Sequence, residues 1–309
     1  MPRPTLPIVL IHLGWPVPEH LGACIAQIRL VTGSDPLVVG PREGAALRSP
    51  ALTRFRRKEQ LSHFGLDGFW RYAAERFLVL EAFMRSQGLD RCLHLESDNL
   101  LYVAPAVVGP WLESRYGTGV ATCPLVVDED TAAIMYVGSL DELTRFNDAL
   151  VELVALGGRR LLRTHGGSTA NEMRMLHILR TDLGLASALP TTLDEAQAMG
   201  SAWVFDPASY GQCVDGIPAN PGVRYVGDHH IPGRELIAGR CDVAWVDGAP
   251  EVRSTSASLP LVNLHLHSKR LARYLPDATD ITLPALRPPR RRDGALAARM
   301  RRIHGRLVP

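Results

Sequence analysis

Two short apolar runs flank an amphipathic segment at the start of the chain, and this arrangement constrains the fold more than any other feature. Residues 7–14 (PIVLIHLG) and 36–40 (PLVVG) read as strands, and a helix is expected from Glu19 to Leu30. Continuous apolar runs are typical of strands buried on both faces, as in parallel sheets covered by helices. A strand–helix–strand order joins parallel strands of one sheet by a right-handed crossover. The sequence therefore predicts an α/β fold.

The rest of the chain continues this alternation of strands and helices. Apolar side chains recur every three or four residues from Phe69 to Gln87, which predicts a helix that Gly88 ends. Further strands are expected within 91–103, 118–127, 132–138, 201–205, 242–246 and 260–269, and further helices over 140–156, 170–182 and up to Leu275. Residues 41–68 are expected to be irregular and polar. We therefore expect a mixed, mostly parallel sheet with helices on both faces.

Charge is distributed unevenly along the chain. The formal net charge is +2, but residues 285–309 hold eight arginines against one aspartate, so the other 284 residues sum to −5, the difference between +2 and +7. We expect one domain over residues 1–283 and a Pro/Arg-rich tail over 284–309. The tail either stays solvated or contacts an anionic membrane surface through Arg287 to Arg306. Because the body is acidic and lacks an aromatic-rich RNA motif, no nucleic-acid partner is expected.

The cysteines and the apolar runs indicate the compartment. Five scattered cysteines without a CxxC pair argue against a zinc knuckle and suit a reducing environment. The N-terminal residues lack the order of a signal peptide, and no run of about 18 or more apolar residues is present. We expect a cytoplasmic protein, which the tail could hold at the inner face of the membrane.

The sharpest local pattern is LHLESDN at residues 93–99. An apolar strand ends there in Glu96 and Asp98, and side chains at i and i+2 of a strand point to one face. Converging carboxylates need a partner because their desolvation is costly. A divalent cation such as Mn²⁺ or Mg²⁺ would be such a partner. The alternative is a solvated strand end or a helix cap.

A second polar pattern is NLHLHSK at residues 263–269. His265 and His267 alternate with leucines, so both imidazoles are expected on one face of a strand, and Lys269 follows on that face if the strand continues. Imidazole is a common ligand of metals such as Mn²⁺, and a lysine ammonium suits a diphosphate as a point charge. The alternative is two hydrogen-bonded histidines on an amphipathic strand.

Together the two patterns would support transfer of a sugar from a nucleotide diphosphate sugar. The leaving diphosphate gains negative charge as the glycosidic bond breaks. A metal held by Asp98 and by His267 or His265 would stabilise this charge. Lys269 would add to the effect, and Glu96 would bind the metal through water or hold the ribose.

The early strand–helix–strand, the acid-x-acid strand end and the late histidine with a nearby lysine resemble the GT-A-fold glycosyltransferase superfamily. Four segments also resemble a bacterial set of such enzymes: FWRYAAERFLVLEAFM, LHLESDNLLY, SAWVFDPASYGQ and VNLHLHSK. In that superfamily an Asp-x-Asp-type motif and a late histidine hold Mn²⁺ and the diphosphate of the donor. The resemblance covers roughly residues 7–275. It implies a GT-A-like domain that uses a UDP- or GDP-sugar. Here the first acid is Glu96, which weakens its role as a metal ligand.

The resemblance also implies roles around the donor. Leu13, Gly14 and Trp15, in the loop after the first strand, would approach the nucleotide. Arg76, on the helix before the acid pair, could reach the donor or be a surface charge. The acceptor would be a hydroxyl-bearing molecule: a glycan, a lipid-linked molecule or a small molecule.

Glu172 is the first candidate for a catalytic base. It follows a Gly-rich turn at the expected start of a helix, where the helix dipole favours the carboxylate form. By the resemblance, it would deprotonate the acceptor hydroxyl of an inverting enzyme. Asp206 competes with it, and the segment 228–230 (DHH) is a third region that spacing does not rank. The alternatives are a capping acid and a turn aspartate, and retention or inversion stays open.

Three other functions stay open at this point. A sugar nucleotidyltransferase would keep the fold but needs a Gly-rich loop with Arg or Lys after the first strand, where this chain has Gly14-Trp15-Pro16. A metal-dependent hydrolase would use the histidine pair as its metal core. A non-catalytic protein would bind a sugar or nucleotide in a degenerate site.

Overall fold

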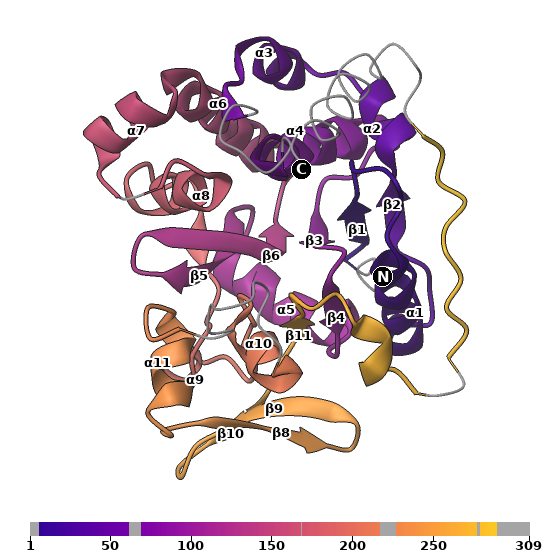
Figure 1. Cartoon of the computed structure of the whole chain (residues 1–309), viewed down its shortest axis with the longest axis vertical. Coiled ribbons are helices and arrows are strands. Elements are labelled where there is room, and N and C mark those ends of the chain that lie inside the picture. The colour runs from indigo at the N-terminus through magenta and orange to yellow at the C-terminus, as the bar shows by residue number, and fades with distance from the viewer. Residues whose placement is uncertain (1–5, 62–68, 168, 217–226, 277–278, 289–309) are drawn as a thin grey trace, which may run out of the picture.

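A six-stranded mixed sheet forms the centre of the molecule, shown in Figure 1 as a computed structural model. The structure describes residues 6–61, 69–167, 169–216, 227–276 and 279–288. In sheet order, the strands are β2 (Leu37–Val39), β1 (Ile8–Ile11), β3 (Cys92–Leu95), β6 (Glu129–Val137), β5 (Val120–Val126) and β7 (Ser187–Ala188). Strand β6 pairs antiparallel with β3 and β5, whereas the other pairs are parallel. The predicted mixed, mostly parallel sheet is confirmed.

Helices cover both faces of the sheet, as expected (Figure 1). One buried cluster joins the sheet to α3 (Pro50–Lys58), α4 (Phe69–Gln87), α6 (Leu140–Leu156), α7 (Gly158–His165) and α8 (Glu172–Thr181). The other joins it to α1 (Glu19–Thr32), α5 (Pro105–Tyr116), α9 (Leu193–Ala198) and α10 (Ser209–Asp215). In the first cluster Phe77 and Phe146 pack edge to face at 6.0 Å. Burial of apolar side chains on both faces is the main stabilising term of such a fold.

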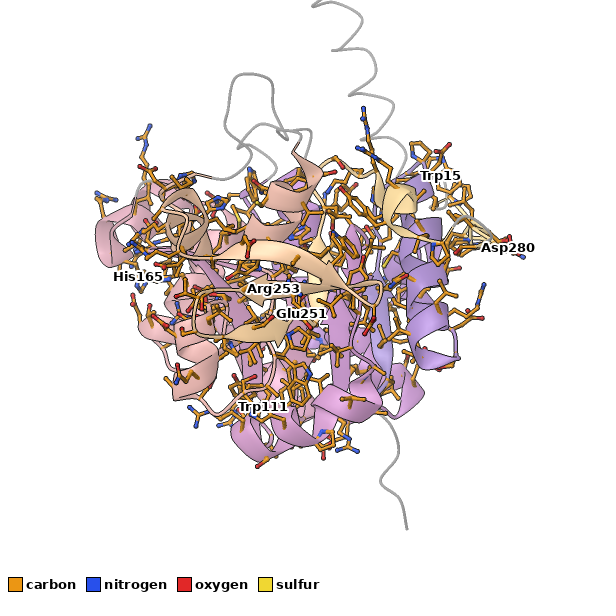
Figure 2. All side chains as sticks on the ribbon, turned by 90° about the horizontal axis from the view of Figure 1, so that it is seen from below. Trp15, Trp111, His165, Glu251, Arg253 and Asp280 are labelled. Carbon is orange, nitrogen blue, oxygen red and sulfur yellow. The ribbon has the colours of Figure 1, made fainter. Side chains whose placement is uncertain are left out.

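Smaller elements lie around this core. Helix α2 (Pro41–Ala46) follows β2, and α11 (Ile231–Ile237) precedes a three-stranded antiparallel sheet of β8 (Asp242–Val246), β9 (Ala249–Arg253) and β10 (Ser258–Pro260). In Figure 2 this sheet faces the viewer, with Glu251 and Arg253 on it as an ion pair of 3.7 Å. A two-stranded sheet joins β4 (Asn99–Leu101) to β11 (Asn263–His265), and the 3-10 helix η3 (Leu271–Tyr274) follows.

Two long helices have the predicted bounds because their sequences specify the ends. Helix α4 covers Phe69 to Gln87, and Gly88 ends it with a φ of 64°. Helix α6 begins after Ser139, whose side chain accepts a hydrogen bond from the Glu142 N–H at 3.2 Å. Such a cap satisfies a donor that the helix itself leaves without a partner.

The prediction of an irregular segment over residues 41–68 was wrong for its described part, which contains α2 and α3. Helix α3 begins at Pro50, and the Ser49 side chain accepts a hydrogen bond from the Leu52 N–H at 3.1 Å. Its buried face contains only three apolar residues, which left a weak periodic pattern among its arginines. The expected strand at 201–205 is only a bridge between Val204 and Leu261, and helix α7 was not predicted.

The last expected strand, 260–269, is also shorter than predicted. Strand β11 ends at His265, and the Leu266 N–H donates to the Asp98 carbonyl at 2.9 Å. The chain then turns: the Lys269 N–H donates to the Leu266 carbonyl at 3.1 Å, and Lys269 has a φ of 61°. His267 and Lys269 therefore do not continue the side-chain alternation of the strand.

Strand pairing brings together two segments that lie far apart in the sequence. In the antiparallel register of β4 and β11, His265 lies opposite Asn99. The buried Asn263 side chain donates to the Asn99 side chain at 2.7 Å. This pairing places the end of β11 beside the acid pair that follows β3.

Several predictions about the ends and surroundings of the chain lie outside these observations. Residues 289–309 are not among the described residues, so the tail over 284–309 and its membrane contact stay predictions. No described helix has the length and apolar character needed to cross a bilayer. No disulfide joins the five cysteines, all of which lie among the described residues.

Candidate functional site

Glu96, Asp98 and His265 converge at the end of β3. The His265 Nε2 atom lies 3.2 Å from a carboxylate oxygen of each acid. One ligand atom from each of the three residues lies within 4.8 Å of the others. The three side chains are 14%, 10% and 6% exposed, so the group is largely shielded from water. Sequence patterns 170 residues apart thus meet at one point.

The donor set of this group fits a divalent cation. Two carboxylates and an imidazole are ligands that Mn²⁺ accepts, and Mg²⁺ accepts the oxygens. Ligands at about 2.1 Å from an octahedral ion lie about 3.0 Å apart along each edge. The two distances of 3.2 Å from the His265 nitrogen are close to this edge length. The spacing of His265 from both acids is therefore compatible with the three side chains holding one ion.

Two cations balance the acid pair. Lys269 pairs with Asp98, and Arg76 pairs with Glu96. Burial alone would raise the pKa of Glu96, but Arg76, His265 and Lys269 together outweigh it and lower this pKa to about 2. Glu96 is therefore a carboxylate throughout the physiological pH range.

Arg76 also reaches Glu172, so it bridges two acids. Its Nη2 atom lies 2.6 Å from the Glu172 Oε1 atom. Glu172 is 3% exposed at the start of α8, after Asn171, whose side chain caps the helix. Burial raises the pKa of Glu172 to about 7, with Arg76 opposing the shift and Glu96 adding to it. Arg76 is thus a buried bridge and not the surface charge considered above.

His267 is not part of the three-residue group. It leaves the strand with the turn after β11, and the Gln212 side chain lies 2.7 Å from its Nδ1 atom. Burial and then the nearby His265 lower the pKa of His267 to about 3. Its ring centroid is 4.8 Å from that of His265. His267 therefore lies beside the metal-type group as a neutral imidazole.

Asp206 has a structural environment. Its carboxylate accepts hydrogen bonds from four main-chain N–H groups, those of Ala208, Tyr210, Gly211 and His265, at 2.7–3.0 Å. It is fully buried, and burial raises the pKa of Asp206 while these donors oppose the shift. A Cβ atom on Gly211 would lie 2.2 Å from the His265 carbonyl oxygen, so α10 and β11 are in direct contact. These bonds fasten α10 to β11 and leave little capacity to accept a substrate proton.

We expect Asp206→Asn to lower the free energy of unfolding by roughly 1.5–3 kcal/mol, since hydrogen bonds to a buried charge are lost or weakened. Urea unfolding followed by circular dichroism measures this loss. Asp35→Asn is the control, because Asp35 is 64% exposed and pairs with a half-exposed Arg29. An effect of Asp206→Asn as small as that of the control would contradict the structural role.

The loop after β1 lies at the same sheet edge as the acid pair, because β1 and β3 are parallel neighbours. The side chain of Leu13 packs against α2, where a Cβ atom on Gly44 would lie 2.6 Å from the Leu13 Cδ2 atom. Gly14 lies beside His12, whose Nε2 atom is buried without a described hydrogen bond. The predicted nucleotide loop is therefore near the group, and its polar side chain is His12.

Two histidines near Lys269 were not singled out from the sequence. Burial, then Lys269 and His12, lower the pKa of His20 to about 4. The His20 Nε2 atom lies 3.5 Å from the hydroxyl of Ser97, between the two acids. The position of His12 directly after the first strand was the available signal. His20, in the first turn of α1, gave none.

The segment 228–230 also lies near the group. The His230 Nδ1 atom is 3.1 Å from the hydroxyl of Ser209, and the rings of His229 and His230 are 4.5 Å apart. Burial, followed by His229 and His267, lowers the pKa of His230 to about 4. This third acid/base region thus adds one neutral imidazole, that of His230, to the side of the site formed by α10.

Comparison with known proteins gives fold-level likenesses. No protein-family model and no curated protein matches the sequence. Solved structures do match, and several glycosyltransferases are among them. Mouse xyloside xylosyltransferase 1 has a TM-score of 0.38 and 8% identity, over 60% of this chain and 85% of that one. The glycosyltransferase GlyE of Streptococcus pneumoniae has a TM-score of 0.37 and 13% identity, over 60% of this chain and 45% of that one. The galactosyltransferase LgtC has a TM-score of 0.34 and 11% identity, over 60% of this chain and 74% of that one.

The superpositions are partial, so the function proposed below is argued from the side chains of the site.

Proposed function

We propose that the chain is a metal-dependent glycosyltransferase that moves a sugar from a nucleotide diphosphate sugar to a hydroxyl acceptor. The observation that carries this proposal is the convergence of Glu96, Asp98 and His265 within 4.8 Å, with Lys269 beside them. In this proposal Mn²⁺ or Mg²⁺ bound there would supply charge stabilisation for the leaving diphosphate. UDP- and GDP-sugars are the proposed donors.

Lys269 is the proposed diphosphate ligand of the chain itself. Its ammonium pairs with Asp98 and its side chain is 47% exposed, so in this proposal it would also pair with a diphosphate bound beside the acids. The left-handed backbone of Lys269 directs it away from the strand alternation and back to the acid pair. The nucleotide of the donor would lie at the sheet edge beside Leu13 and Gly14.

Glu172 is the proposed catalytic base on the acceptor side. A general base is most effective when its pKa lies near the working pH, and burial holds the pKa of Glu172 at about 7. Arg76 links it to Glu96, so the acid that accepts the proton and the metal-type group share one rigid bridge. This role belongs to an inverting reaction, and Asp206 is the weaker candidate because its oxygens are already occupied.

Two alternatives are less well supported. The hydrolase interpretation used both histidines as a metal core, whereas His265 faces the two acids and His267 faces Gln212. A nucleotidyltransferase would need an Arg- or Lys-bearing loop after β1, and this loop carries His12 and Gly14 instead. A non-catalytic binding protein stays as the outcome of a negative test.

Thermal unfolding with UDP, GDP and CDP, each with and without Mn²⁺, tests the proposal. We expect one nucleoside diphosphate to raise the unfolding temperature only when Mn²⁺ is present, since a ligand at about 100 times its Kd adds about 2.7 kcal/mol of stability. Asp98→Asn removes a charged ligand and should abolish this shift. Asp242→Asn, an exposed aspartate on β8, should keep it.

The other outcomes distinguish the alternatives. Stabilisation by Mn²⁺ alone, with no nucleotide effect, would favour the hydrolase. The absence of any response would favour the non-catalytic protein and would contradict the proposal.

A further inference from the structure

A cavity away from the acid pair lies between the β8–β9 hairpin and η3. Its volume is about 340 Å³, and it is lined by Trp245, Gly248, Arg273, Tyr274, Leu275 and Pro276. This volume is within the range of small-ligand sites, roughly 300–1,000 Å³. Glu96, Asp98 and His265 do not line it, so it is a separate site. In Figure 1 the hairpin forms one end of the molecule.

Two aromatic rings form one wall of the cavity. The rings of Trp245 and Tyr274 are stacked, with centroids 6.0 Å apart and planes 6° apart. Tyr102 packs edge-on against Trp245 at 5.8 Å, which holds the indole in place. Trp245 is nevertheless 43% exposed. A large aromatic side chain that is fixed on one side and open on the other is typical of a ligand-binding surface.

The hairpin turn gives this wall a defined position. Asp247 and Gly248 both have positive φ angles, 49° and 80°, and connect β8 directly to β9. Two such residues are the signature of a tight two-residue hairpin turn. Trp245, close to the turn, pairs with Pro250 on β9. The indole is therefore carried by regular backbone rather than by a long loop.

The remaining polar group of the cavity is the exposed guanidinium of Arg273. A guanidinium carries five N–H donors and no acceptor. The cavity thus offers an electron-rich aromatic face beside hydrogen-bond donors. A pyranose ring has the complementary surface, with one face of C–H groups and a rim of hydroxyl oxygens. A cationic ligand is disfavoured by the charge of Arg273.

The cavity and the acid pair are joined by one short segment. The Tyr274 hydroxyl donates to one carboxylate oxygen of Asp215 at 3.1 Å. The other oxygen of Asp215 accepts from the Ser268 N–H at 3.1 Å. Ser268 immediately precedes Lys269, which pairs with Asp98. Asp215 therefore connects a residue that lines the cavity to the segment that carries Lys269.

We propose that this cavity is a carbohydrate subsite that binds a pyranose ring against the exposed surface of Trp245, which the stacked Tyr274 supports, and by hydrogen bonds from Arg273. Its assignment as an anchor for a glycan acceptor rests on the proposed glycosyl transfer. Sugar binding itself does not, because it needs neither metal nor donor.

Saturation-transfer NMR on the full chain tests the subsite with maltose, lactose, cellobiose and chitobiose as probes. We expect at least one disaccharide to receive saturation on its ring C–H protons, in the absence of metal and nucleotide. Trp245→Ala should weaken the apparent affinity by more than about tenfold, as expected for a central aromatic contact. Arg273→Gln should weaken it less and keep the stacking signal.

Tyr72→Ala is the matched control. Tyr72 is also 43% exposed and lies beside an arginine, Arg71, but it does not line this cavity. Its replacement should leave the signal unchanged. Circular dichroism of each variant shows whether the fold is retained.

Three results would overturn the subsite: no transfer to any of the four sugars, equal loss with Tyr72→Ala, or stronger transfer to adenosine or uridine than to the sugars. The last would indicate a nucleoside site instead. Asp98→Asn separates the two proposals, because it should abolish metal-dependent nucleotide binding and leave sugar binding intact. Sugar binding without any nucleotide response would retain the subsite and remove the transferase.

Discussion

Replacement of Arg76 by methionine is expected to lower the free energy of unfolding by about 3–5 kcal/mol near neutral pH, the typical cost of removing one partner from a buried ion pair. Arg76 is 14% exposed and bridges Glu96 and Glu172, which are 14% and 4% exposed. Without the guanidinium, two shielded carboxyl groups would face each other without a cation between them. Urea unfolding followed by tryptophan fluorescence measures the loss.

Arg85→Met is the matched control for this prediction. Arg85 lies on the same helix, α4, and pairs with Glu81 at 3.3 Å, but it is 52% exposed. Glu81 is 2% exposed, but it keeps a hydrogen bond from the Asn147 side chain at 3.1 Å, so removal of the half-exposed Arg85 should cost less than removal of Arg76. A second test adds Glu96→Gln and Glu172→Gln to Arg76→Met, which should restore part of the stability because the unpaired charges are removed. If Arg76→Met lowers the free energy of unfolding no more than Arg85→Met does, the bridge does not contribute to stability.

The loss of stability caused by Arg76→Met should depend on pH. In the native chain the pKa of Glu96 is held at about 2, below the ordinary 4.5, so its pairing stabilises the fold above pH 4.5 and is lost as pH falls towards 2. In the Arg76→Met variant this pairing is absent, so the two chains should differ most above pH 4.5 and converge below it. Glu172 has the opposite sign: its pKa is raised to about 7, so its burial stabilises the fold most below pH 4.5, and this contribution is lost as pH rises through 7.

The acid pair was predictable from its position directly after a buried strand. The strand alternation expected for it was wrong, because β3 ends at Leu95 and both acids lie in the turn to β4, where the Asn99 N–H donates to the Glu96 carbonyl at 3.2 Å. The alternating histidines were also visible in the sequence, but the choice between His265 and His267 was not. That choice depends on where β11 ends, and a contact from another element, the Leu266 N–H to the Asp98 carbonyl, ends it.

The electrostatic partners were less accessible to sequence reasoning. Arg76 lies twenty residues before Glu96 and ninety-six before Glu172, and only the packing of α4 against α8 and the sheet brings the three together. Asp206 looked like an ordinary turn residue, yet four main-chain donors from α10 and β11 converge on it. Sequence periodicity predicts which face of a single helix or strand is buried. The roles of Arg76 and Asp206 depend on contacts between different elements, which periodicity does not predict.

The same distinction explains which secondary-structure elements were predicted correctly. The bounds of helices α4 and α6 follow from long apolar repeats and from caps such as Ser139. Helix α3 buries few residues on a short arginine-rich segment, so tertiary packing rather than its own pattern defines it. The site thus combines a locally encoded acid pair with partners that the tertiary structure supplies.

Glu172→Gln is expected to reduce the rate of sugar transfer by about 10²–10⁴-fold, the usual contribution of a general base. The pH profile carries the argument. Because the base must be deprotonated and its pKa is about 7, the native rate should fall about tenfold per pH unit below 7 and level off above it. The variant should lose this acidic limb. The measurement is kcat/KM between pH 5.5 and 9 with the donor that stabilises the protein.

The variant also loses a partner of Arg76, so a rate loss alone would not separate a base from a positioning residue. Glu142→Gln removes an acid from the start of another helix, α6, and should change neither the rate nor the profile. If Glu172→Gln retains the acidic limb, Glu172 acts through Arg76 and another group accepts the proton. If the rate is unchanged, the reaction needs no base here, and a retaining mechanism becomes the better account of the same metal-type group.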